Sequence, residues 1–160
     1  SNKAPRRVEE LSLSEGASKH MAPVVGKTTA AVLTASVGEA TKYKTAAAYE
    51  KSMGLNLKEK SSGTQKGALR ITKRGPGVAR KFLYLAALRL IRSDAVARAW
   101  YAKKVKRDGG KTKNKAVVAV MRKLIRALWY VAQGADFDST KLFDTRRLNL
   151  QPVSLSEALR

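Results

Sequence analysis

The chain contains no cysteine, and His20 is the only histidine among its 160 residues. The absence of cysteine excludes disulfide bonds and thiolate metal sites. A single histidine excludes metal sites made of several imidazoles and most catalytic designs in which histidine is the general base. Any chemistry must therefore come from hydroxyl, carboxylate or cationic side chains.

Acidic residues are also scarce, and long apolar runs are absent. Only 12 Asp and Glu residues stand against 33 Lys and Arg residues, which gives a formal net charge of +21. An excess of this size indicates a polyanionic partner, and nucleic acid is favoured over a membrane surface or an acidic protein. No apolar run approaches the roughly 20 residues that span a bilayer, and no signal peptide is visible. We therefore expect an intracellular protein that binds nucleic acid and no membrane.

The remaining composition supports one folded domain. Hydrophobic residues make up 44% of the chain, and a domain of this length buries roughly 68–70% of its unfolded surface. Helical periodicity recurs on both sides of the central segment, whereas residues 68–72 offer at most one short strand. The sequence therefore predicts an all-α domain of about six helices.

Glycines separate the predicted helices of the first half. Residues 5–20 favour a weak helix that ends at Gly16. A later helix closes at Gly38, and a short one follows Thr45 as its N-cap and stops before Gly54. Hydroxyl side chains at helix starts and glycines past helix ends have the hydrogen bonding and backbone freedom that such positions need.

The sequence Pro-Val-Val-Gly at residues 23–26 predicts a turn between two helices. Such a turn is similar to the helix-hairpin-helix, in which turn amides and the start of the next helix receive a DNA phosphate. Gly26 and Lys27 are the expected contacts, within a hairpin unit over residues 22–54. The alternative is a plain turn glycine between packed helices.

The central segment, residues 60–81, combines two adjacent hydroxyls with glycines and cations. Ser61 and Ser62 are followed by Gly63 and three further glycines, and the segment holds seven cations and no acid. Glycine admits close backbone approach, cations neutralise phosphate, and a serine hydroxyl can attack a phosphodiester. The alternative is a flexible basic loop that only holds nucleic-acid backbone. The cations from which we expect nucleic-acid contacts are Lys66, Arg70, Lys73, Arg74, Arg80 and Lys81.

Three helices are predicted after the central segment. Residues 81–91 are apolar on almost every side, which indicates a central buried helix. Asp94 is placed to cap a second helix that ends near Arg107, and a turn follows at residues 108–110. The last helix starts near Thr112 and carries an apolar stripe at 3.6-residue spacing. The stripe consists of Ala116, Val117, Val120, Met121, Leu124, Leu128 and Val131, flanked by a solvated basic face of Lys113, Lys115, Arg122, Lys123 and Arg126.

Trp100, Trp129 and Tyr130 are expected in the core or at its edge rather than as platforms for stacking bases. Beyond Gly134 we expect an irregular tail with one terminal helical turn. The positive charge is concentrated before that tail. Residues 58–92 contain ten basic residues and one acidic residue, and residues 93–133 contain eleven basic residues and two acidic residues. The basic surface is therefore expected on the central segment and the helices that follow it.

Several of these motifs together resemble a known family. They run from Pro-Val-Val-Gly at 23–26 through Ser62-Gly63 and Gly67 to Ile-Thr-Lys-Arg-Gly at 71–75 and the helix after Ala79. They are similar to the C-terminal transposase domain of the insertion sequence one-ten family, bridge-RNA-guided recombinases related to Piv-type DNA invertases. The chain departs from the pattern after Lys-Arg-Gly, where Pro76-Gly77 replaces the usual asparagine or aspartate.

The resemblance implies a catalytic role for Ser62 with Gly63, because the family's serine before glycine links covalently to DNA. Ser61 is the neighbouring competitor. It also implies DNA and guide RNA as partners, a homo-oligomer of the full-length protein, and a bacterial or archaeal cytoplasmic setting at the nucleoid. The resemblance also implies a divalent metal, Mg, bound by four acidic residues of a RuvC-like domain. Nothing before residue 58 resembles such a domain. No metal site is expected within this chain, and the chain alone is expected to recombine poorly.

This interpretation divides the chain into three parts. Residues 1–20 are expected to form an N-terminal helical segment or linker, residues 21–133 the transposase domain, and residues 134–160 an irregular tail. Within the domain, the catalytic loop spans 55–75 and the basic helices span 76–133. The alternatives are a non-catalytic DNA- or RNA-binding helix-hairpin-helix module and a structural protein of a ribonucleoprotein particle.

Overall fold

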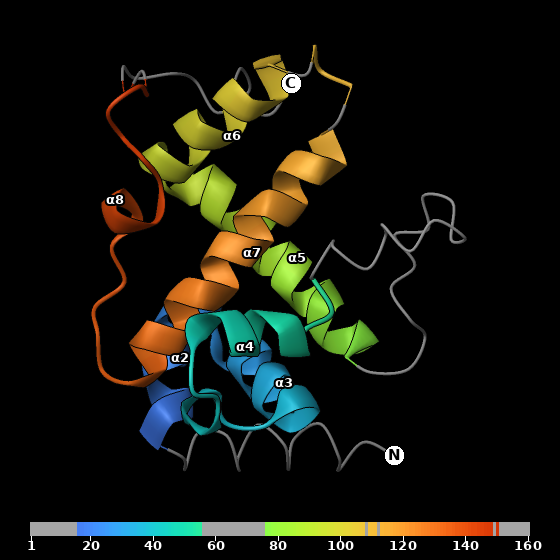
Figure 1. The fold of residues 1–160 in the computed structure, drawn as a ribbon, viewed down its shortest axis with the longest axis vertical. Coiled ribbons are helices and arrows are strands. Elements are labelled where there is room, and N and C mark those ends of the chain that lie inside the picture. Colours follow the sequence, from blue (N-terminus) through green and yellow to red (C-terminus); the bar gives the residue numbers. More distant parts are fainter. Residues whose placement is uncertain (1–15, 56–75, 108, 112, 149, 151–160) are drawn as a thin grey trace.

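The computed structural model describes residues 16–55, 76–107, 109–111, 113–148 and 150. Throughout these ranges the regular structure is helical and no strand occurs, which confirms the all-α prediction (Figure 1). The first half contains α2 (Gly16–Val25), α3 (Lys27–Val37), the 3-10 helix η1 (Ala40–Lys42) and α4 (Ala46–Ser52). The second half contains α5 (Gly77–Ser93), α6 (Ala95–Arg107), α7 (Lys113–Ala132) and α8 (Ser139–Leu142).

Helix α7 is the centre of the fold. It packs against α2, α4, α5, α6, α8 and η1, and it runs through the molecule between the α2–α4 group and α6 (Figure 1). Every residue of the predicted apolar stripe is buried, and Leu128 is fully inaccessible to solvent. The apolar face therefore supplies a shared wall to helices that are distant in the sequence.

The prediction of a central buried helix over residues 81–91 is wrong in one respect. In α5 only one face is buried, through Leu83, Ala87 and Ile91 among others, while Leu85 is 45% exposed. Helix α5 packs against α3, α6 and α7. Uniform apolarity in the sequence therefore did not distinguish a half-exposed helix from a surrounded one.

The α2–α3 junction is tighter than predicted. Helix α2 begins at Gly16, where a helix end was expected, and it includes Pro23 in its last turn. Gly26 alone separates α2 from α3, with φ 91° and ψ 156°. Proline removes one helical hydrogen bond and its ring clashes with the carbonyl four residues earlier, so a helix that contains it is disfavoured, and α2 ends two residues after Pro23. The turn predicted at residues 23–26 is thus a single glycine. The part of the first predicted helix that precedes residue 16 lies outside the described residues.

Local capping follows the predictions. The Thr45 side chain accepts a hydrogen bond from the Ala48 amide at 3.0 Å, and Asp94 accepts one from the Ala97 amide at 2.9 Å. Asp138 caps α8 by accepting from the Thr140 amide at 3.0 Å. Each side chain satisfies an amide that has no partner within its own helix.

The tail contributes to the core, which was not predicted. Its single helical turn, α8, is followed by Phe143, which is 1% exposed and lies 5.1 Å from the Trp100 ring between centroids. The segment after α7 thereby turns back over α6 and α7. The expected terminal helical turn would lie in residues 151–160, which are outside the described residues.

Candidate nucleic-acid interface

Six of the predicted site residues, together with Ser61, lie outside the described residues. They are Ser62, Gly63, Lys66, Arg70, Lys73 and Arg74. Gly26, Lys27, Arg80 and Lys81 are described, and they lie on elements that precede or follow residues 56–75. The part of the candidate interface that the structure describes therefore comes from the helices before and after this segment in the sequence.

The α2–α3 junction brings two cations to Gly26. The Gly26 amide donates to the Ala22 carbonyl at 2.7 Å, so this amide is already used within the fold. Lys27 is exposed at the start of α3, and an Arg89 terminal nitrogen lies 3.5 Å from where a Cβ on Gly26 would stand. Phosphate binding at this turn stays a prediction, in which Lys27 and Arg89 would supply the charge. Arg89 was missed because its position on α5 gives no sequence signal of its distance to Gly26.

Arg80 is buried within the fold, with an exposed fraction of 4%. Its Nη1 donates to the Met53 carbonyl at 3.2 Å, and burial lowers the pKa of its guanidinium. An added Cβ on Gly54 would stand 2.7 Å from the same nitrogen, so glycine makes room for the arginine. Arg80 thus joins the end of α4 to the start of α5, whereas its neighbour Lys81 is exposed. DNA contacts by these two residues stay predictions.

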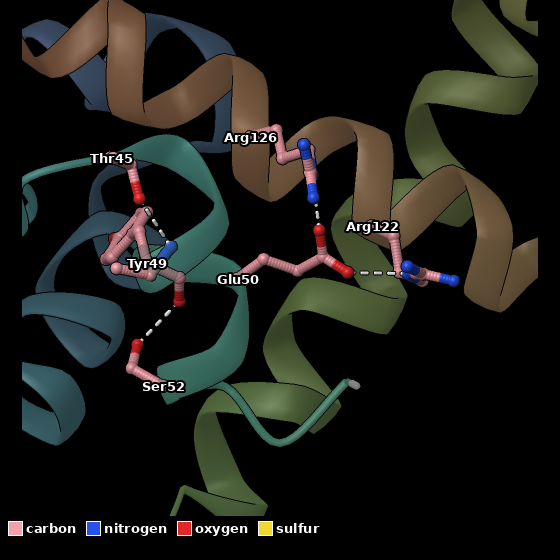
Figure 2. A network of polar contacts seen from close by, with 7 residues as sticks. Thr45, Tyr49, Glu50, Ser52, Arg122 and Arg126 are labelled. Atoms are coloured by element: carbon pink, nitrogen blue, oxygen red, sulfur yellow. Dashed lines mark hydrogen bonds and ion pairs between the residues drawn. The ribbon is translucent and has the colours of Figure 1, made fainter. Parts of the chain in front are cut away.

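A buried carboxylate connects α4 to α7. The Glu50 side chain is 4% exposed, and its Oε2 accepts a hydrogen bond from Arg122 Nε at 2.6 Å (Figure 2). Its Oε1 accepts from Arg126 Nε. Glu50 was missed from the sequence, although a single carboxylate within an otherwise apolar stretch, residues 46–49, was a possible signal.

A basic groove of about 540 Å³ lies between α6 and residues 144–148. Its cationic lining consists of Lys103, Lys104, Arg107, Arg146 and Arg147, with Trp100, Asp144 and Leu148 completing the wall. The one carboxylate is paired, because Arg146 donates to both Asp144 oxygens at 2.9 Å. Hydrogen bonds from Arg146 lower the pKa of Asp144 to about 2. The groove therefore has an excess of positive charge suited to a phosphate backbone.

The aromatic side chains have separate roles. Trp100 and Trp129 are half-buried at the core edge, as predicted, and Trp129 Nε1 donates to the Tyr43 carbonyl at 2.9 Å. Tyr130 is 56% exposed, so its assignment to the core or core edge is wrong. Tyr130 lies on the polar side of α7, next to the stripe residue Val131.

The described side chains do not fit a metal-binding role. No group of three or more His, Asp or Glu side chains that could hold a metal ion occurs within the described ranges. Asp136 and Asp138 follow α7, and Asp138 is used as a helix cap. We therefore assign no metal ligand to these residues. In the same part of the chain, no helix is long and apolar enough to cross a membrane.

Comparisons with known proteins place these features in context. Residues 20–102 match the family model described as "Transposase IS116/IS110/IS902 family". The chain is 30% identical over 120 residues to the "Insertion element IS110 uncharacterized 43.6 kDa protein" of Streptomyces coelicolor. That alignment covers 75% of this chain and 29% of the relative. No solved structure matches the chain.

Proposed function

This chain belongs to the IS116/IS110/IS902 transposase family, and from that premise we propose that it is the serine-bearing, DNA-binding segment of a recombinase. The observation that carries the proposal is the family match over residues 20–102, which includes Ser62-Gly63 and the cations around them. The net charge of +21 and the basic groove beside α6 support DNA as the polyanionic partner.

In the proposed reaction, Ser62 Oγ attacks a phosphorus atom of the DNA backbone. An Oγ–P bond forms, the bond from phosphorus to one sugar oxygen breaks, and a phosphoserine link retains the broken end. The serine proton is lost and the leaving sugar oxygen gains one, so the step is balanced without an oxidant or reductant. A later attack by a sugar hydroxyl on the phosphoserine would restore Ser62 and join a new strand.

Cations in this chain would stabilise the charge that develops on the phosphate oxygens. At an effective dielectric constant near 20, a unit charge about 5 Å away contributes roughly 3 kcal/mol. Arg70, Lys73 and Arg74 are the proposed sources, since they follow Ser62 closely in the sequence. Arg80 is proposed to contribute its positive charge from a buried position, where it donates to the Met53 carbonyl at the end of α4.

Further parts of the machinery are proposed to lie beyond this chain, which spans 29% of the length of its matched relative. We propose that a RuvC-like domain binds divalent metal, that a guide RNA selects DNA, and that the full-length protein is a homo-oligomer. The described residues offer no cluster of metal ligands.

The experiment that tests the proposal is detection of a covalent protein–DNA adduct after denaturation. With this chain in its full-length transposase, with Mg²⁺, guide RNA and target DNA, we expect an adduct that Ser62→Ala abolishes and Ser61→Ala retains. DNA affinity should change little in either variant. An adduct lost only in Ser61→Ala would move the nucleophile by one residue.

The second candidate function is a non-catalytic DNA- or RNA-binding module, which the basic groove beside α6 would serve equally well. Such a module would bind nucleic acid and form no adduct in any complete assembly. The same denaturing assay therefore separates the two functions.

A further inference from the structure

The Glu50 cluster, made of Glu50, Arg122 and Arg126, joins a buried anion to two half-exposed cations. The Glu50 side chain is 4% exposed, whereas those of Arg122 and Arg126 are 40% and 51% exposed. Figure 2 shows Glu50 reaching from α4 to the two arginines, which lie one turn apart on α7. The carboxylate thus lies inside the protein while the guanidinium groups reach its surface.

The hydrogen bonds leave the outer ends of both arginines available. Each arginine donates its Nε to a different Glu50 oxygen. Within the described part of the chain, the terminal nitrogens of Arg122 and Arg126 make no hydrogen bond to protein. A guanidinium has five N–H donors, so four remain on each arginine. Both guanidinium groups are thus held by Glu50, and their remaining donors have no protein partner among the described residues.

The cluster also has more positive charge than its own carboxylate neutralises. Cations at positions i and i+4 of a helix repel each other, and Glu50 supplies one negative charge for two arginines. Lys123 adds a third cation nearby. Its pKa is lowered by burial and then by Lys104, Arg126 and Arg122. An anion bound at the arginines would offset this excess.

A purely structural link between α4 and α7 is the simpler explanation of the cluster. Replacing a buried ion pair with well-packed apolar groups is often neutral or stabilising, so packing alone does not demand this arrangement. One arginine would be enough to neutralise Glu50. The second arginine adds a planar guanidinium whose terminal donors match the geometry of a phosphate group.

We propose that Arg122 and Arg126, oriented by Glu50, clamp one phosphate group of the DNA backbone. This rests on the proposed function, because it takes DNA as the partner. Glu50 is on α4, and in the sequence the end of α4 at Ser52 precedes the segment that contains Ser62. Glu50 is a positioning residue in this arrangement, and the two arginines are the groups that touch DNA.

The test compares DNA affinity and its salt dependence among variants of the 160-residue chain. Glu50→Gln raises the net charge by one, so simple charge attraction predicts tighter binding. The clamp predicts the opposite: DNA affinity should fall about tenfold, because without the Glu50 carboxylate the guanidinium groups of Arg122 and Arg126 are no longer held in position. Thermal unfolding of each variant shows whether the chain remains folded.

A double variant, Arg122→Gln with Arg126→Gln, measures the phosphate contact directly. We expect the slope of log affinity against log salt to become shallower by about 0.9, the value for one phosphate on duplex DNA. The matched control, Arg92→Gln with Arg98→Gln, removes the same charge near the α5–α6 junction. Arg98 already donates to the carbonyls of Ile91 and Arg92, so the control should leave the slope unchanged.

The outcomes separate the clamp from the proposed function. Equal or tighter binding by folded Glu50→Gln overturns the clamp, as does a slope that changes equally in both double variants. If the double variant at Arg122 and Arg126 fails to fold, the result for Glu50→Gln decides alone. Failure of the unchanged chain to bind DNA overturns the proposed function, and the clamp with it.

Discussion

Single residues join parts of this protein that are far apart in the sequence. Glu50 links α4 to α7, and Arg80 links the start of α5 to the Met53 carbonyl at the end of α4. Removing one partner of a buried charged pair leaves a charge without compensation, which costs about 3–5 kcal/mol. Asp144 and Arg146 differ from these, since they are only two positions apart and lie at the surface.

The Asp144–Arg146 pair supports a prediction about pH. Hydrogen bonds from Arg146 lower the pKa of Asp144 from 3.8 to about 2 in the folded protein. Because the folded value is depressed, the pair contributes stability above the unfolded pKa, and that contribution is lost as the pH falls through about 2. An NMR titration of the Asp144 carboxyl should show a midpoint near 2, which Arg146→Gln should return toward 3.8. The same midpoint in both proteins would contradict this assignment.

The helices show which features local sequence can predict. Thr45, Asp94 and Gly38 mark helix ends because capping depends on residues within one turn, and all three lie where they were expected. The stripe of α7 was predictable because its period is a property of one helix. The surroundings of α5 and the insertion of Phe143 into the core were not, since they depend on which helices meet in space.

The candidate site was less predictable than the fold for the same reason. Residues that share one short motif, such as Ser62 and Gly63, stand out in the sequence. The partners of Arg122 and Arg126 are 72 and 76 residues away, and no local pattern indicates which acid they meet. Arg80 was predicted as a DNA contact from its charge, and only the structure shows that it is buried.

The α2–α3 junction supports a prediction about a helix connection. Gly26 has φ 91° and ψ 156°, a region of backbone space that is essentially restricted to glycine. Gly26→Ala should therefore lower the free energy of unfolding by about 1–3 kcal/mol. Gly77→Ala is the matched control, because Gly77 is helical and its added Cβ would stand 3.7 Å from Arg80, an ordinary contact. That control should be neutral or stabilising, by up to about 1 kcal/mol, and denaturant titration measures both changes.

For the molecule as a whole, the positive charge is distributed over several surfaces. The groove beside α6, the Glu50 cluster and the α2–α3 junction each present cations, and the total of 33 Lys and Arg residues far exceeds the 12 acids. Nucleic acid that contacts several of these surfaces would release many counterions. Binding by this chain should therefore depend strongly on salt and little on DNA sequence.

If about five phosphates are neutralised, log affinity should fall against log salt with a slope near −4.5. Affinity would then fall about 500-fold between roughly 50 and 200 mM salt. Fluorescence anisotropy with two unrelated duplexes of equal length measures both the slope and the sequence dependence. A DNA affinity that does not change with salt concentration, or that differs widely between the two duplexes, would contradict binding through charge.

The central position of α7 has a consequence for how the protein is made. A ribosome adds about 5–20 residues per second from the N-terminus, so α2, α3, α4 and α5 are complete before α7 exists. Yet α2, α4 and α5 all pack against α7, and the family match over residues 20–102 ends before α7 begins. The faces of α2, α4 and α5 that pack against α7 therefore have no α7 to cover them until residues 113–132 leave the ribosome. The segment that matches the family model thus lacks the helix against which α2, α4 and α5 pack.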